Sequence, residues 1–174
     1  MSLLHPAKLL GTWFGAGLVP RMSGTAGSAA ALPFAYIIQK YWGNQALLMA
    51  SVIAFFAGWI ASNVYLRTTN DKDPKEIVID EVAGQWLLLS MMYPTFISYL
   101  IGLLVFRFFD IVKPWPVSLA DREIPGGFGV MFDDILAACY PLFIFCVIGW
   151  IGHLTGHPVN FELLRQFLAE KNVF

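Results

Sequence analysis

The chain has 174 residues, of which 57% are hydrophobic and only 13% are charged, and its mean hydropathy is +0.64. Because an average soluble domain carries about 25% charged residues, this composition argues against a solvated surface on all sides and predicts a membrane protein. The net charge of −1 gives no indication of a nucleic-acid partner.

Two uncharged stretches lie in the first half of the chain. After Met22, the first half of residues 22–39 consists of Gly, Ser, Thr and Ala, which suits either close helix packing or a loop that re-enters the bilayer. Their run SGTAGS (23–28) could approach a phosphate through backbone N–H groups, or it is a simple turn or packing motif. Residues 46–66 contain no Asp, Glu, Lys or Arg. They have about the 20 residues that a membrane-spanning helix needs.

A third uncharged stretch, residues 82–106, is interrupted around Pro94. A single straight helix would separate Glu81 from Arg107 by about 40 Å. A helical hairpin that turns near Pro94 would instead return both ends to one side. Each leg would then have about 11–12 residues, too few to span, so the hairpin would be embedded from one side. The distribution of Lys and Arg favours the hairpin slightly, with eight cations on one side and three on the other.

A second candidate spanning helix covers residues 135–154, which also carry no charge. Cys139 and Cys146 lie seven residues apart within it, about two helical turns, which is too far for a disulfide between them. We expect both thiols to be buried and inert.

Acidic residues gather where the charged segments meet these apolar stretches. The clusters are Asp80-Glu81, Asp110 and Asp133-Asp134. Helix capping alone would explain Asp80 and Asp133, but not Asp110, which is expected at a helix C-terminus, where an acid is disfavoured. Carboxylates are the ligands that Mg²⁺ prefers, and only the hairpin brings the three clusters to one membrane face.

Cations lie among these acids. Arg107, Asp110 and Lys113 follow one another at intervals of three residues on one side of a helix that ends at Lys113-Pro114. Together with a metal held by the acids, they predict a phosphate pocket. The alternative is a set of interfacial ion pairs with snorkelling side chains. A second glycine run at 126–129 could also approach a phosphate as a flexible loop, or form a turn.

Four motifs resemble those of bacterial phosphatidylglycerophosphatase A. They are SGTAGS (23–28), IDEVAGQW (79–86), FRFFDIVKPWP (106–116) and DREIPGGFGVMFDD (121–134). The resemblance extends from about Leu9 to His153. It therefore predicts one domain over residues 1–174, with a core at about 9–153 and a C-terminal tail at 155–174. One departure is Ser23, where the family pattern has Pro.

The resemblance implies an all-α, integral membrane helical bundle in the bacterial inner (cytoplasmic) membrane, with its active site at the cytoplasmic face. It also implies a magnesium-dependent enzyme that hydrolyses phosphatidylglycerophosphate to phosphatidylglycerol and inorganic phosphate. The expected partners are the lipid substrate and the membrane.

Three sets of site residues follow from the acids, the cations and the resemblance. The expected metal ligands are Asp80, Glu81, Asp110, Asp133 and Asp134. Catalytic roles are expected for Asp80, Glu81, Asp110 and Asp134, with Glu81 and Asp134 the more central members of their pairs. The substrate phosphate is expected at Thr25, Ser28, Arg107, Lys113 and Arg122.

Two rival classes fit less well. A small transporter with acidic residues at the membrane face would be expected to place acids in mid-span, where residues 46–66, 82–106 and 135–154 have none. A lipid-linked alcohol phosphotransferase would require several aspartates spaced four apart on one helix, and this chain lacks them.

Overall fold

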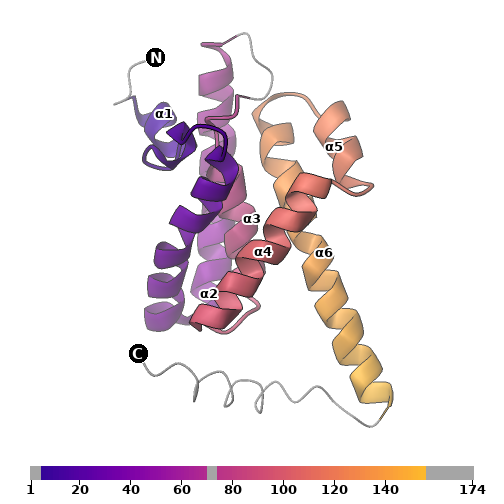
Figure 1. The fold of residues 1–174 in the computed structure, drawn as a ribbon. Helices are drawn as coiled ribbons and strands as arrows, with labels where there is room; N and C mark the ends of the chain where they lie inside the picture. Colours follow the sequence, from indigo (N-terminus) through magenta and orange to yellow (C-terminus); the bar gives the residue numbers. More distant parts are fainter. Residues whose placement is uncertain (1–4, 70–73, 156–174) are drawn as a thin grey trace.

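In the computed structural model, which describes residues 5–69 and 74–155, all regular secondary structure is helical (Figure 1). The helices are α1 (Pro6–Gly11), η1 (Ala16–Leu18, a 3₁₀ turn), α2 (Ser23–Leu66), α3 (Ile79–Leu89), α4 (Phe96–Val112), α5 (Val117–Glu123) and α6 (Gly126–Leu154). The all-α prediction is confirmed for this part of the chain. The predicted C-terminal tail lies, apart from Thr155, outside the described residues.

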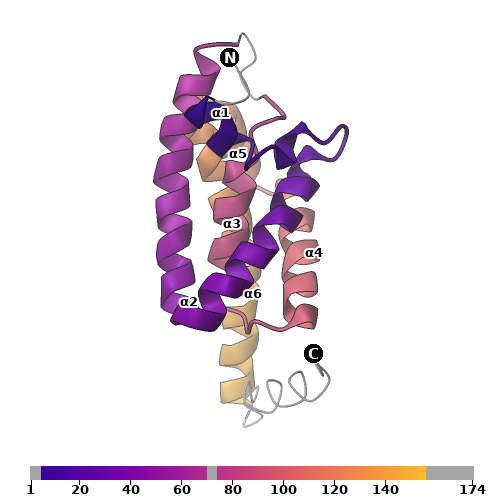
Figure 2. The ribbon, with the colours of Figure 1, turned by 90° about the vertical axis from the view of Figure 1, so that its left-hand side faces the viewer.

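Helix α2 consists of two arms that meet at Gly43. This glycine has φ 82° and ψ 178°, a conformation that favours a residue without a Cβ. From the bend the arms 23–42 and 44–66 run in opposite directions (Figure 2). The bend separates the two uncharged stretches predicted for this region. One prediction made the SGTAGS run a loop, and the structure contradicts it. Residues 23–28 form the first turns of α2.

The uncharged stretch 82–106 is divided between α3 and α4. Helix α3 ends at Leu89, and α4 begins after Thr95, whose hydroxyl accepts a hydrogen bond of 3.2 Å from the Ser98 amide. At the other end of the stretch, Arg107 Nη1 lies 3.6 Å from Glu81 Oε1. The straight-helix alternative, with these residues about 40 Å apart, is therefore excluded. Helix α4 ends where Lys113 adopts a left-handed conformation (φ 43°), directly before Pro114, as predicted.

Helix α6 begins earlier than the sequence suggested. It starts at Gly126, after Pro125, so Asp133 and Asp134 lie inside the helix and not at its N-terminus. Capping therefore does not explain Asp133. The glycine run 126–129 is likewise not a flexible loop but the first turn of α6. A Cβ on Gly127 would lie only 2.7 Å from the Asn63 amide nitrogen, so this glycine allows α6 to pack closely on α2.

Apolar side chains cover much of the outside of the bundle. Helices α2 and α6 are long and apolar enough to cross a membrane. Large side chains on both are strongly exposed, such as Ile60 at 66% and Phe143 at 69%. Cys139 and Cys146 are also exposed, so the prediction of buried thiols was wrong. The lower half of α6 extends beyond the other described helices (Figure 1), and large side chains there are exposed, such as Trp150 at 63% and Leu154 at 64%.

Helix α3 is the centre of the bundle, because it packs against α2, α4 and α6. Four apolar residues of α3 itself are fully buried in this packing: Ile79, Val82, Ala83 and Leu89. A hydrogen bond across the packing joins α3 to α2, where the Trp86 indole donates to the Ala31 carbonyl at 3.0 Å. This packing fixes the position of the first turn of α3, which carries Asp80 and Glu81.

A buried amide ties together the end of the bundle opposite this turn. Gln39 Nε2 lies 2.6 Å from the Met92 carbonyl, 3.2 Å from the Leu89 carbonyl and 2.8 Å from Asn44 Oδ1. The Tyr99 hydroxyl donates to Gln39 Oε1 at 2.7 Å. One side chain thus links the bend of α2 to the turn between α3 and α4.

Candidate active site

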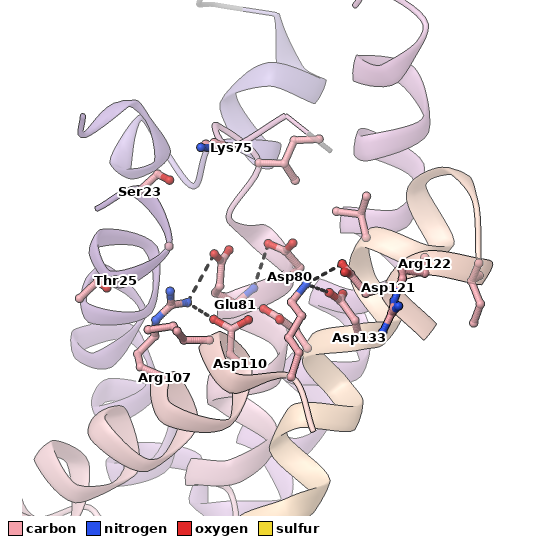
Figure 3. Close-up of a pocket in the computed structure, with 18 of the residues that line it drawn as sticks. Ser23, Thr25, Lys75, Asp80, Glu81, Arg107, Asp110, Asp121, Arg122 and Asp133 are labelled. Carbon is pink, nitrogen blue, oxygen red and sulfur yellow. Dashed lines mark hydrogen bonds and ion pairs between the residues drawn. The ribbon is translucent and has the colours of Figure 1, made fainter. Parts of the chain in front are cut away.

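A cavity of about 820 Å³ opens where the N-termini of α2, α3 and α6 meet the C-terminus of α4 (Figure 3). Pockets for small molecules usually have about 300–1,000 Å³. The lining includes six acids and five cations: Asp80, Glu81, Asp110, Asp121, Asp133, Asp134, Arg21, Lys75, Arg107, Lys113 and Arg122. The cavity can therefore hold a charged group considerably larger than a single phosphate.

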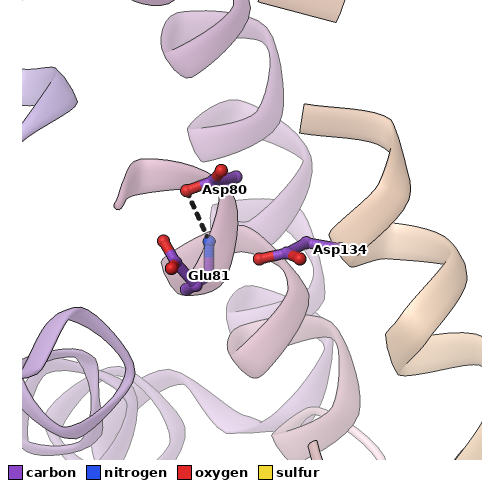
Figure 4. Close-up of side chains that lie close together, drawn as sticks. All are labelled: Asp80, Glu81 and Asp134. Carbon is purple, nitrogen blue, oxygen red and sulfur yellow. Dashed lines mark hydrogen bonds between the residues drawn. The ribbon is translucent and has the colours of Figure 1, made fainter. Parts of the chain in front are cut away.

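Three carboxylates converge at the base of this cavity. Asp80 and Glu81 come from the first turn of α3, and Asp134 points toward them from α6 (Figure 4). Each offers an oxygen within 4.8 Å of the others. Glu81 Oε2 and Asp134 Oδ2 are buried without a hydrogen-bond partner among the described residues. Buried acceptors without partners are costly, so this donor set fits a divalent cation.

Electrostatics support the same conclusion. Burial raises the pKa of Asp80 well above its ordinary value, and the charges of Glu81 and Asp134 raise it further. Burial also raises the pKa of Glu81, while hydrogen bonding to Asp80 and the charge of Arg107 oppose the rise. Buried carboxylates that repel one another become favourable only when a proton or a cation offsets their charge.

The two other predicted metal ligands are each paired with a cation. Asp110 forms an ion pair with Arg107 one helical turn earlier, and Asp133 Oδ2 lies 2.6 Å from Lys113 Nζ. Lys113 also lies 2.6 Å from Asp121. Burial alone would lower the pKa of Lys113, but the hydrogen bonds to both aspartates outweigh it and raise the pKa above the ordinary value. Lys113 therefore stays positively charged.

Four of the five predicted phosphate-binding residues line the cavity, and one does not. Thr25, Arg107, Lys113 and Arg122 line the cavity. Arg122 is exposed, and its Nε donates to the Ser118 carbonyl at 3.1 Å. Ser28 is not among the lining residues, because it is fully buried and its hydroxyl donates to the Gly24 carbonyl at 2.9 Å.

Sequence reasoning missed three charged residues of the lining: Arg21, Lys75 and Asp121. Asp121 stands in the DREIP motif, and its contact with Lys113 depends on the turn between α4 and α5. Lys75 belongs to the charged segment 67–81, a signal that could have identified it. Arg21 directly precedes the SGTAGS run, but nothing in its local pattern indicates that it faces a cavity.

The family model for phosphatidylglycerophosphatase A matches residues 9–149. The chain belongs to this family. It is therefore a lipid phosphatase of the phosphatidylglycerophosphatase A family, as the motifs predicted.

Curated relatives cover most of the chain. A phosphatidylglycerophosphatase A of Haemophilus influenzae is 32% identical over 87% of this chain and 94% of its own length. The phosphatidylglycerophosphatase A of Escherichia coli is 34% identical over 86% and 87%. A Bacteroides thetaiotaomicron protein, whose name provisionally assigns it as a phosphatidylinositol-3-phosphatase, is 35% identical over 82% and 93%. No solved structure matches the chain significantly.

Gly24 controls how closely α2 approaches the site, and its replacement should be damaging. A Cβ at this position would clash with Glu81 Oε1 and lie 2.8 Å from Arg107 Nη1. We expect Gly24→Ala to displace this pair and lower kcat/KM by a factor on the order of 10², as small displacements of catalytic groups do. Gly11→Ala is the matched control, since nothing lies within 4 Å of its added Cβ. Equal activity of both variants in a phosphate-release assay would contradict this role of Gly24.

Proposed function

We propose that this member of the family is a magnesium-dependent enzyme that hydrolyses phosphatidylglycerophosphate to phosphatidylglycerol and inorganic phosphate. The observation that carries the proposal is the buried cluster of Asp80, Glu81 and Asp134 beside Arg107, at the base of a cavity large enough for the substrate headgroup. The names of the Haemophilus influenzae and Escherichia coli relatives support the choice of substrate.

Asp80, Glu81 and Asp134 would hold Mg²⁺, whose oxygen preference and charge suit three clustered carboxylates. When bound, the metal supplies charge neutralisation at the phosphate oxygens and makes a bound water more acidic. Asp110 and Asp133 are not assigned as ligands of the metal, because each is paired with a cation.

The other residues of the cavity would bind and orient the phosphate. The planar guanidinium of Arg107 presents several N–H donors, so it can hold two phosphate oxygens while it keeps Asp110 as a partner. Lys113 contributes a fixed positive charge rather than a proton, since its pKa is raised. Asp110 is the candidate to accept the proton of the attacking water, because it lies outside the triad and beside Arg107.

In this reaction a water oxygen forms the new bond to phosphorus, and the bond from phosphorus to the glycerol oxygen breaks. A carboxylate takes the proton lost by the water and passes it to the glycerol oxygen, which leaves as a hydroxyl. Enzymes achieve most phosphoryl transfer through positioning and charge stabilisation, which this arrangement of cations can supply.

The bundle is proposed to lie in the bacterial inner membrane with the cavity at the cytoplasmic face, and the α3–α4 turn embedded from that side. The exposed apolar side chains of α2 and α6 support this placement, as does the concentration of Lys and Arg at the cavity end. A substrate held in the bilayer could then place its headgroup in the cavity while its acyl chains stay in lipid.

Phosphate release by the purified protein in detergent micelles tests the function. With phosphatidylglycerophosphate and Mg²⁺ we expect steady turnover, with EDTA we expect its loss, and excess Mg²⁺ should restore it. Phosphatidylinositol 3-phosphate is the comparison substrate, because one relative carries that name. A well-folded sample that releases no phosphate from phosphatidylglycerophosphate, with Mg²⁺ or Mn²⁺, would overturn the proposal.

A further inference from the structure

The five cations of the cavity fall into two groups. Arg107 and Lys113 lie among the carboxylates and are ion-paired with them. Arg21, Lys75 and Arg122 also line the cavity, yet form no ion pair with an acid among the residues that the structure describes. A cation without an acidic partner in a ligand cavity is available to bind an anion.

The substrate of the proposed function, on which this inference rests, carries two phosphates. The terminal phosphomonoester is cleaved, whereas the phosphodiester joins the headgroup to diacylglycerol and persists in the product. The triad with Arg107 accounts for the first phosphate only. The second is permanently anionic, and the six acids of the cavity would repel it unless separate cations hold it.

Arg21 and Lys75 are suited to this second anion by position. Arg21 lies two residues before the start of α2, and Lys75 lies four residues before the start of α3. Both cations therefore directly precede the N-terminus of a helix that borders the cavity. In the view of Figure 3 Lys75 and Ser23 lie on the upper side of the cavity, whereas Asp110 and Asp133 lie on its lower side. Arg21 also adopts a left-handed backbone conformation (φ 67°), which is unfavourable for a residue with a Cβ. Arg122 fits less well, because it lies on α5, beside Asp121, and donates to the Ser118 carbonyl.

Two exposed apolar residues of the cavity lining provide a route for the rest of the lipid. Met22 at the N-terminus of α2 and Ile111 near the C-terminus of α4 both line the cavity, and they are 59% and 69% exposed. Large apolar side chains at the opening of such a charged cavity suit contact with acyl chains. A diester at Arg21 would lie next to Met22, where diacylglycerol can leave the cavity for the bilayer.

We infer that Arg21 and Lys75 form a phosphodiester subsite, which holds the non-reacting phosphate of the headgroup while the terminal phosphate lies at the triad. The subsite makes the enzyme selective for lipids that carry a diester and a monoester on one headgroup. It also gives the product phosphatidylglycerol a binding site that inorganic phosphate does not share.

Product binding tests the subsite, since each product carries only one of the two phosphates. We expect Arg21→Gln/Lys75→Gln to raise KM for phosphatidylglycerophosphate and the inhibition constant of phosphatidylglycerol by roughly tenfold, as charge-assisted hydrogen bonds are lost. The inhibition constant of inorganic phosphate and kcat should stay within about twofold. Arg67→Gln is the matched control, because Arg67 is exposed at the same end of the bundle but does not line the cavity.

A neutral detergent separates the subsite from general attraction to anionic lipid. If Arg21 and Lys75 only attract the lipid surface, the effect will appear in anionic vesicles, will be shared by Arg67→Gln and will vanish in neutral micelles. That result would overturn the inference, as would an equal loss of inorganic phosphate binding. Calorimetric titration of phosphatidylglycerol into the same micelles needs no turnover. It therefore tests the subsite even if phosphatidylglycerophosphate is not hydrolysed, and equal affinities of wild type and double variant would count against it.

Discussion

Asp134→Asn should reduce phosphate release from phosphatidylglycerophosphate by a factor of at least about 10³, because charge neutralisation by a bound metal is worth several kcal/mol in the transition state. Asp134 contributes one of the three convergent oxygens, and its Oδ2 is buried without a partner among the described residues. The amide has nearly the same shape but no charge, so Mg²⁺ binding should weaken while the helix packing is kept. The measurement is a magnesium titration of kcat with wild type and variant at equal protein concentration.

Thermal stability distinguishes a lost metal site from a damaged fold. Without magnesium, Asp134→Asn should melt no lower than wild type, because it removes one of three buried charges that repel one another. Magnesium should then stabilise wild type but not the variant. Glu76→Gln is the matched acid-to-amide control, since Glu76 pairs with Lys8 and does not line the cavity. A variant that keeps both its activity and its stabilisation by magnesium would show that Asp134 is not a ligand.

The charge pattern of the sequence was sufficient to find the region of the site. All five predicted acids line one cavity, because the α3–α4 turn brings Glu81 to Arg107 and α6 brings Asp134 to α3. Which three acids converge could not be predicted, since that depends on where α6 begins. With the helix starting at Gly126, Asp134 faces the triad and Asp133 reaches Lys113. The sequence pattern had suggested a start after both acids.

The bend at Gly43 shows a different limit. The pair Gly43-Asn44 is a turn signal, but the surrounding residues are apolar enough to continue a helix. Its effect becomes visible only through tertiary contacts, such as Gln39 with Asn44 and with the carbonyls of Leu89 and Met92.

Ser28 illustrates the same limit for a single side chain. It lies three residues after Thr25, on a similar side of the helix, but its hydroxyl bonds back to Gly24 and does not face the cavity.

Gln39→Leu should lower the free energy of unfolding by about 2–3 kcal/mol, because it leaves several buried polar groups without partners. The side chain is only 4% exposed and contacts the carbonyls of Leu89 and Met92, while the Tyr99 hydroxyl donates to it. These contacts hold the bend of α2 against the α3–α4 turn, and in an apolar environment water cannot replace them. The measurement is unfolding in mixed micelles with increasing sodium dodecyl sulfate, followed by circular dichroism.

Tyr99→Phe is the graded control for this prediction. It removes only the bond from the hydroxyl to Gln39 Oε1 and leaves that one acceptor without a partner, so its cost should be about 1 kcal/mol, less than that of Gln39→Leu. The loss in Gln39→Leu should also leave the kcat of the folded fraction within about twofold of wild type, since Gln39 does not line the cavity. If the two variants unfold together, the carbonyls of Leu89 and Met92 do not depend on Gln39.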